Sequence, residues 1–136
     1  MKTKIKMKRV YTLILAASLI MLASTSSTAQ SNPGSKVLRH VVLFKFKDSS
    51  SPNDVKKVEA AFADLATKLP LIKGYEWGKN NSPENLNQGL THCFLLTFSS
   101  DKDRDEYLVH PDHKAFGKIL GPHLDKVTVV DYWTEK

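Results

Sequence analysis

Residues 37–47 read VLRHVVLFKFK, and this stretch decides the fold. Successive side chains of a β-strand point to opposite faces, so the two faces can be separated by eye. One face carries Leu38, His40, Val42, Phe44 and Phe46. The other face carries Val37, Arg39, Val41, Leu43 and Lys45. Both faces are largely apolar near the middle, which an ordinary half-exposed strand does not need. We therefore expect a strand whose sheet is covered on both sides.

Helix and strand signals alternate along the rest of the chain. Ser51 and Pro52 predict the start of a helix, as N-cap and first helical residue, and Pro70 stops it. Ser100 predicts the start of a second helix, which must end before Pro111. The remaining elements are a short helix over residues 113–120 and strands over residues 72–79, 90–98 and 127–133.

The order strand, helix, strand, strand, helix, strand consists of two split βαβ halves. It predicts an α+β, ferredoxin-like fold, in which a four-stranded antiparallel sheet carries its helices on one face. The second face of such a sheet stays open, and here it would expose several apolar side chains. A second copy of the sheet covers this face most simply. We therefore expect a homodimer whose two sheets form one α+β barrel.

The first 29 residues have the pattern of a secretory signal peptide. A basic start is followed by an apolar run over residues 13–23 and by small residues up to Ala29. The apolar run is too short to span a bilayer comfortably. We expect cleavage after Ala29, a linker over residues 30–36 and one domain over residues 37–136. The mature protein is then exported, to the periplasm or the extracellular space, without a membrane attachment.

The net charge of +6 comes almost entirely from the signal peptide. Five of the 20 basic residues and none of the 14 acidic residues precede residue 30, which leaves 15 against 14, a net charge of +1. The mature chain has no basic stripe, so nucleic acid is excluded as a partner. Cys93 is the single cysteine, so no internal disulfide can form, and we expect it to pack as a small apolar residue.

Residues 107–113, YLVHPDH, concentrate groups that move protons near neutral pH. We interpret Tyr107 and His113 as a catalytic pair. His113 would take a proton from the carbon beside a carbonyl, while Tyr107 donates a hydrogen bond to the oxyanion. The structural alternative is a helix-end motif in which His113 bonds a backbone carbonyl. His110 and Asp112 are explained by helix ends, with Asp112 as the N-cap of the short helix.

His40 and His92 lie on strand faces that they share with phenylalanines. Histidine in such a place is more often a satisfied core residue than a ligand, yet both are candidates for the wall of a substrate-binding pocket. A metal site at His110, Asp112 and His113, joined by His40 or His92, is a rival interpretation. Pro111 interrupts the regular helical spacing on which such metal sites usually rely, so we expect no metal. Haem is a further possibility that no sequence feature selects, and we expect no cofactor.

Three segments together resemble the stress-responsive α/β-barrel (Dabb) family, and the similarity extends over nearly the whole mature chain. They are residues 38–47, residues 89–94, and residues 107–113 followed by Phe116 and Gly117. The resemblance implies the dimeric ferredoxin-like barrel predicted above from the element order.

The resemblance also implies roles for individual residues. A plant polyketide cyclase of the family uses a tyrosine and a histidine as its acid–base pair, and these roles align with Tyr107 and His113. His40 and His92 align with further histidines of that enzyme. The implied function is lyase-like or cyclase-like chemistry on a small apolar carbonyl compound. A non-catalytic stress-response or small-ligand-binding protein is the alternative, because a fold alone does not make an enzyme.

Overall fold

The computed structural model describes residues 36–135. In chain order the elements are β1 (Leu38–Phe46), α1 (Pro52–Lys68), β2 (Gly74–Lys79), β3 (His92–Phe98), α2 (Asp101–Val109), α3 (Pro111–Leu120) and β4 (Leu124–Trp133). The predicted signal peptide, residues 1–29, and the predicted linker up to residue 35 lie outside the described residues. No helix within residues 36–135 combines the length and the apolar character needed to cross a membrane.

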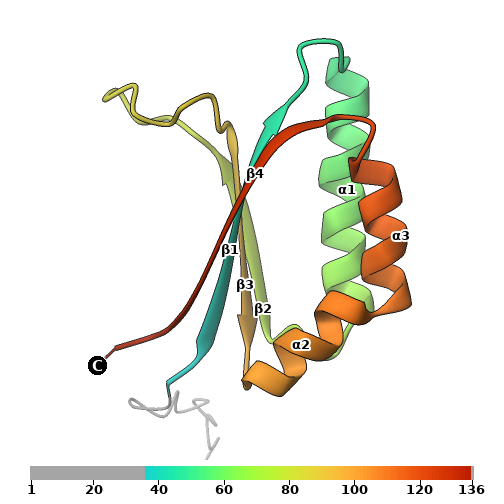
Figure 1. Cartoon of the computed structure of the whole chain (residues 1–136), viewed down its shortest axis with the longest axis vertical. Coiled ribbons are helices and arrows are strands. Elements are labelled where there is room, and N and C mark those ends of the chain that lie inside the picture. Colours follow the sequence, from blue (N-terminus) through green and yellow to red (C-terminus); the bar gives the residue numbers. More distant parts are fainter. Residues whose placement is uncertain (1–35, 136) are drawn as a thin grey trace, which may run out of the picture. The chain divides into compact units, whose positions relative to one another are not determined.

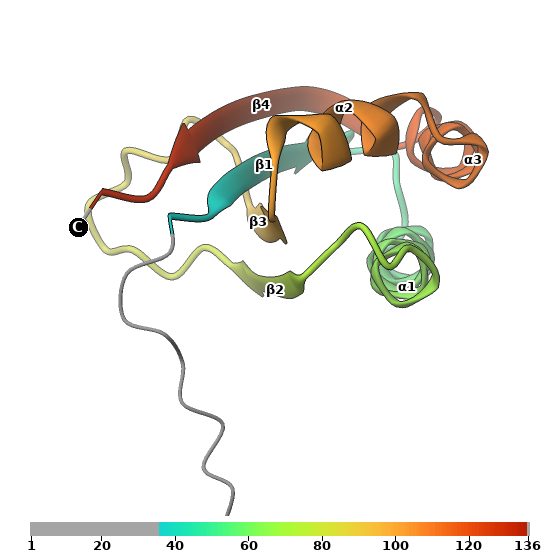
Figure 2. The same ribbon diagram turned by 90° about the horizontal axis from the view of Figure 1, so that it is seen from below.

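The four strands form one antiparallel sheet in the order β2-β3-β1-β4. All three helices lie on the same side of this sheet (Figure 1). Seen from below, α1 lies nearer to β2 and α3 lies nearer to β4 (Figure 2). This arrangement is the α+β, ferredoxin-like fold predicted from the element order, and that prediction is confirmed.

Helix α1 begins where the sequence predicts it to begin. The Ser51 side chain accepts a hydrogen bond from the Asp54 backbone N–H at 3.2 Å, and the Asp54 carboxylate accepts one from the Ser51 N–H at 3.1 Å. This reciprocal capping box satisfies amide groups that the first helical turn leaves free. The helix then presents Val58, Phe62 and Leu65 to the sheet, where all three side chains are buried.

The core fills the space between the helices and the sheet. Its centre is a stack of aromatic rings, in which the centroid of Phe62 lies 4.6 Å from that of Phe94 and 4.5 Å from that of Phe116. Each such fully buried side chain stabilises the fold by roughly 1.5–3 kcal/mol. The other buried apolar residues are Leu38, Val42, Phe44, Val58, Leu65, Leu69, Leu96, Phe98, Tyr107 and Leu120. Residues 36–135 therefore form a hydrophobic core of their own.

The predicted start of the short helix is wrong. Helix α3 begins at Pro111 instead of His113, and His110 is its N-cap instead of Asp112. The His110 Nδ1 atom accepts a hydrogen bond from the Asp112 backbone N–H at 3.2 Å. Because His110 also ends α2, one residue joins the two helices. The predicted role of His110 at a helix end is confirmed.

The sheet face away from the helices is not covered by any part of residues 36–135. Across its centre runs a row of directly paired residues from β2, β3, β1 and β4: Glu76, Leu95, Val41 and Val130. Val130 is 49% exposed and Tyr132, on the same face, is 46% exposed. Cys93 also lies there and is exposed, so its predicted packing is wrong for the single subunit.

Strand β4 is the least covered strand of the sheet. It lies at the edge of the sheet that residues 36–135 form, where it pairs with β1 alone, and it is exposed along nearly its whole length. Its side chains alternate between the uncovered face and the side on which the helices lie. On the helix side, Val127 pairs with Phe44, Val129 pairs with Val42, and Asp131 pairs with His40.

Candidate functional site

A cleft of about 400 Å³ lies between the helix-facing side of β1 and β4 and the helices α2 and α3. Its walls are mainly apolar and include Val42, Phe44, Phe62, Leu108, Phe116, Leu120, Leu124, Val127 and Val129. Its ionisable side chains are those of His40, Tyr107, His113 and Asp131. The cleft therefore brings together three of the four predicted site residues and adds Asp131, which the sequence analysis missed.

Tyr107 occupies the centre of this group. It lies on α2 with only 1% of its surface exposed, and its ring centroid is 4.4 Å from that of His113 and 5.8 Å from that of His40. Burial raises the pKa of the Tyr107 hydroxyl well above its ordinary value, which keeps this group protonated. Because Tyr107 lines the cleft, we expect this proton to be available to a ligand there.

His113 is held by the backbone of the preceding helix. Its Nδ1 atom lies 3.1 Å from the Leu108 carbonyl oxygen. A carbonyl oxygen only accepts, so Nδ1 carries the proton and Nε2 of the neutral ring is left as the acceptor. Burial lowers the pKa of His113, a direction that nearby His40 reinforces and the Leu108 bond opposes. The predicted hydrogen bond from His113 to a backbone carbonyl therefore exists. It also leaves Nε2 unprotonated, so that this atom can act as a base.

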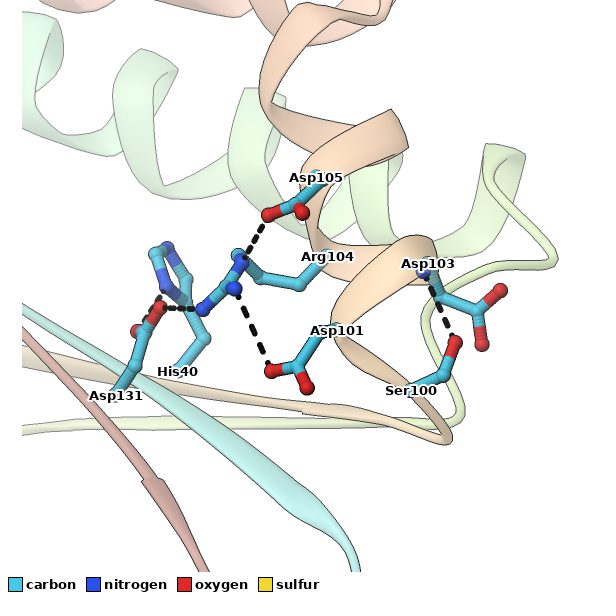
Figure 3. Close-up of polar contacts among 7 residues, drawn as sticks. All are labelled: His40, Ser100, Asp101, Asp103, Arg104, Asp105 and Asp131. Atoms are coloured by element: carbon cyan, nitrogen blue, oxygen red, sulfur yellow. Dashed lines mark hydrogen bonds and ion pairs between the residues drawn. The ribbon is translucent and has the colours of Figure 1, made fainter.

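His40 is paired with an acid on the neighbouring strand. Its Nδ1 atom lies 2.6 Å from Asp131 Oδ1, as expected for residues directly opposite each other on β1 and β4. The Asp131 carboxylate accepts the Nδ1 proton, and in the tautomer with its single proton on Nδ1 the Nε2 atom is an acceptor. Arg104 of α2 binds the second oxygen of the same carboxylate, with Nη1 2.6 Å from Oδ2 (Figure 3).

Asp131 and Arg104 each carry a signal in the sequence. Asp131 shares a strand face with Val127 and Val129 and is thus an acid on an otherwise apolar face. Arg104 is a cation in the first half of α2, where the helix dipole favours anions. Neither signal identifies the residues that Asp131 and Arg104 bind. The pairing of Asp131 with His40 depends on the register of β4 against β1.

His92 lies outside this cleft. Its Nε2 atom is 3.0 Å from Glu59 Oε1 and its Nδ1 atom is 2.8 Å from the Thr91 hydroxyl. Burial raises the pKa of Glu59, but the hydrogen bonds from Lys79 and His92 outweigh it, so the net pKa is lowered. His92 borders a separate hollow of about 470 Å³ next to the β2–β3 loop. A substrate contact for His92 stays a prediction and is no part of the site built around Tyr107.

The residues of the rival metal interpretation do not converge. His110 Nδ1 is occupied by the Asp112 backbone N–H, whereas His113 lines the cleft. Within residues 36–135, no three or more histidine, cysteine, aspartate or glutamate side chains are grouped so that they could hold a metal ion. What the cleft offers is a buried phenol and two imidazoles in an apolar surrounding, which suits proton transfer.

Comparison with known proteins places this arrangement in a family. A stress-response A/B barrel domain-containing protein of Arabidopsis thaliana is 42% identical over 95 residues, which cover 70% of this chain and 87% of that protein. Olivetolic acid cyclase of Cannabis sativa is 28% identical over 99 residues, which cover 73% of this chain and 98% of the cyclase.

Solved structures share the fold. A hydroxynitrile lyase from Passiflora edulis matches with a TM-score of 0.71 and 26% identity, over 76% of this chain and 97% of the lyase. A dimeric ferredoxin-like protein of unknown function from Jannaschia sp. matches with a TM-score of 0.62 and 27% identity, over 71% of this chain and 97% of that protein. The model of the stress-responsive A/B barrel domain matches residues 38–134. The chain therefore belongs to the stress-responsive A/B barrel (Dabb) family.

Proposed function

We propose that this protein is an acid–base catalyst that removes a proton from the carbon next to the carbonyl group of a small apolar compound. The observation that carries the proposal is the convergence of Tyr107, His113 and His40 on one cleft with mainly apolar walls. The names of two relatives, a cyclase and a lyase, support chemistry of this kind in the family.

The geometry suggests a role for each side chain. His113 Nε2 takes the proton, the C–H electron pair moves into the carbonyl group, and the Tyr107 hydroxyl donates a hydrogen bond to the enolate oxygen. His40 orients the ligand through its free Nε2. The apolar walls exclude water, which strengthens the hydrogen bond from Tyr107. The step needs only a base and a hydrogen-bond donor.

The proposal includes assembly and location. We propose a homodimer in which the uncovered sheet faces of two copies pack together. The apolar side chains of Leu95, Val41 and Val130 at the centre of that face and the dimeric relative of 27% identity support this arrangement. We also propose that the protein is exported, on the strength of the signal-peptide pattern in residues 1–29.

Proton abstraction can be measured without knowing the natural substrate. Phenylacetone or a methyl alkyl ketone, incubated with the protein in D₂O, should exchange its α-protons for deuterium, as followed by proton NMR. Replacing His113 with glutamine should slow the exchange by on the order of 10²–10⁴-fold, because a positioned base contributes that much. His110→Gln is the matched control, since this imidazole lies outside the cleft.

The pH dependence of the same exchange reports on His113. Its folded pKa lies below the ordinary value of 6.5, so the ring stays neutral as the pH falls through 6.5. The rate of deuterium exchange should therefore stay constant as the pH falls through 6.5. It should decrease only at lower pH, where His113 takes up a proton. A rate that already declines above pH 6.5 would contradict this assignment of the base.

The competing function is ligand binding without turnover. The bond from His113 to the Leu108 carbonyl favours it, because a structural role would also account for that bond. Saturable binding of a ketone, observed by NMR without any deuterium exchange, would support this alternative and contradict the catalytic proposal.

Export has its own test. The whole chain should be cleaved after Ala29 when it is expressed in a bacterium, so the protein recovered outside the cytoplasm should begin at Gln30. N-terminal sequencing checks this result. Recovery of the intact chain from the cytoplasm alone would contradict export.

A further inference from the structure

We propose that Arg104 is a positioning residue of the cleft: it orients Asp131, and Asp131 in turn holds His40 in the tautomer whose Nε2 atom accepts a hydrogen bond from the ligand. The consequence for catalysis rests on the proposed function, whereas the effect on the His40 tautomer does not. The ligand would then carry an O–H or N–H donor in addition to its carbonyl group.

Three elements meet at the Asp131 carboxylate. His40 of β1 binds one of its oxygens and Arg104 of α2 binds the other, both at 2.6 Å. A carboxylate that is engaged at both oxygens by different partners cannot rotate without breaking one of the bonds. The Nδ1–H of His40 consequently faces an acceptor of fixed orientation (Figure 3).

Two acidic side chains of the same helix fix the orientation of the Arg104 guanidinium group. Arg104 Nε lies 2.7 Å from Asp105 Oδ1, and Nη2 lies 3.4 Å from Asp101 Oδ1. These contacts occupy two of its nitrogen atoms and leave Nη1 for Asp131. The acids also compensate for a cation that the N-terminal half of a helix disfavours. Arg104 is therefore held in place by its own helix and reaches across to β4.

The bond at Nδ1 decides what His40 offers to a ligand. Asp131 Oδ1 lies 2.6 Å from Nδ1, and Arg104 holds the other oxygen of the same carboxylate, which keeps Oδ1 directed at the ring. In the tautomer with its proton on Nδ1, Nε2 has a lone pair, and a hydroxyl, enol or amide N–H of the ligand would bind there.

Nitrogen NMR of protein labelled with ¹⁵N-histidine tests the inference without any turnover. At about pH 8, His40 should show one tautomer, with its proton on Nδ1. Arg104→Leu should produce a mixture with the Nε2–H tautomer, whereas Arg104→Lys should largely preserve the native form. Lys45→Met is the matched control, because it breaks a 2.6 Å pair with Asp125 that lies outside the cleft.

Kinetics of the exchange reaction with a hydroxyl-bearing ketone, 4-hydroxyphenylacetone, provide the second measurement, because this probe has both a carbonyl group and an O–H donor for His40 Nε2. Arg104→Leu should lower kcat/KM on the order of tenfold, the equivalent of one charged hydrogen bond. In the Asp131→Asn background the same change should have little further effect, because the two residues act in series. Arg104→Gln is an independent variant in case the leucine variant does not fold.

The outcomes separate this inference from the proposed function. A native His40 tautomer in both Arg104→Leu and Arg104→Gln would overturn the positioning role, and Arg104 would then be a surface ion pair of small effect. A mixed tautomer in these variants, together with a wild-type protein that shows no exchange, would support the positioning role and contradict the proposed catalysis.

Discussion

Replacing Tyr107 with phenylalanine should lower the rate of α-proton exchange by on the order of 10²–10³-fold, the cost of losing one donor to a developing oxyanion. The fold should survive, because the substitution removes one hydroxyl group and keeps the buried ring. The ring itself stays in place between His113 and His40. The exchange rate and the midpoint of urea denaturation, measured on the same protein, separate the chemical effect from any loss of stability.

Tyr75 offers a matched control for this substitution. Its hydroxyl is also buried and has no hydrogen-bond partner within residues 36–135, but it does not line the cleft. Burial raises the pKa of Tyr75 to about 12, so both phenols are neutral at physiological pH. Tyr75→Phe should leave the exchange rate unchanged. Equal rates for Tyr107→Phe and the wild type would remove Tyr107 from the proposed mechanism, whereas unfolding of Tyr107→Phe would assign it a structural role.

The second large effect concerns assembly. Replacing Leu95 with glutamate should convert the dimer to a monomer, because Leu95 lies between Val41 and Glu76 in the central row of the uncovered sheet face. An unpaired carboxylate buried in an interface costs on the order of 3–5 kcal/mol, which weakens association by roughly 10²–10³-fold or more. Sedimentation equilibrium over a range of protein concentrations measures the change.

The monomer should remain folded, since the core lies on the other side of the sheet. Val109→Glu is the matched control, because Val109 is 64% exposed at the end of α2 and far from the uncovered face. This variant should stay dimeric. A wild-type protein that sediments as a monomer would contradict the proposed homodimer. A Leu95→Glu variant that remains dimeric would place the interface on another surface.

Periodicity and helix-end chemistry predicted most of the fold, because they are local properties of the chain. The alternation in β1 separated its two faces correctly, and Ser51 with Pro52 marked the start of α1. The start of α3 was misjudged because two residues competed for the N-cap. Pro111 suits the first helical position, which makes the residue before it the cap, and the His110 ring supplies the acceptor.

The candidate site was predictable only where its members are close in sequence. Tyr107 and His113 were found because one short motif contains both. His40 and His92 looked equivalent, since both lie on the helix-facing side of their strands. The register of β3 against β1 separates them: His92 pairs with Phe44, four residues along the strand from His40. The role of Asp131 depends in the same way on a pairing between strands that are distant in sequence.

The exposed position of β4 has a consequence for how binding and assembly depend on each other. One side of this strand forms a wall of the cleft through Val127 and Val129, and the other side carries Val130 and Tyr132 toward the proposed partner subunit. Within residues 36–135 β4 pairs with β1 alone, so a second copy packed on the uncovered face would restrain this wall of the cleft. A ligand in the cleft and the partner subunit would then be thermodynamically linked, and each would tighten the binding of the other by the same factor.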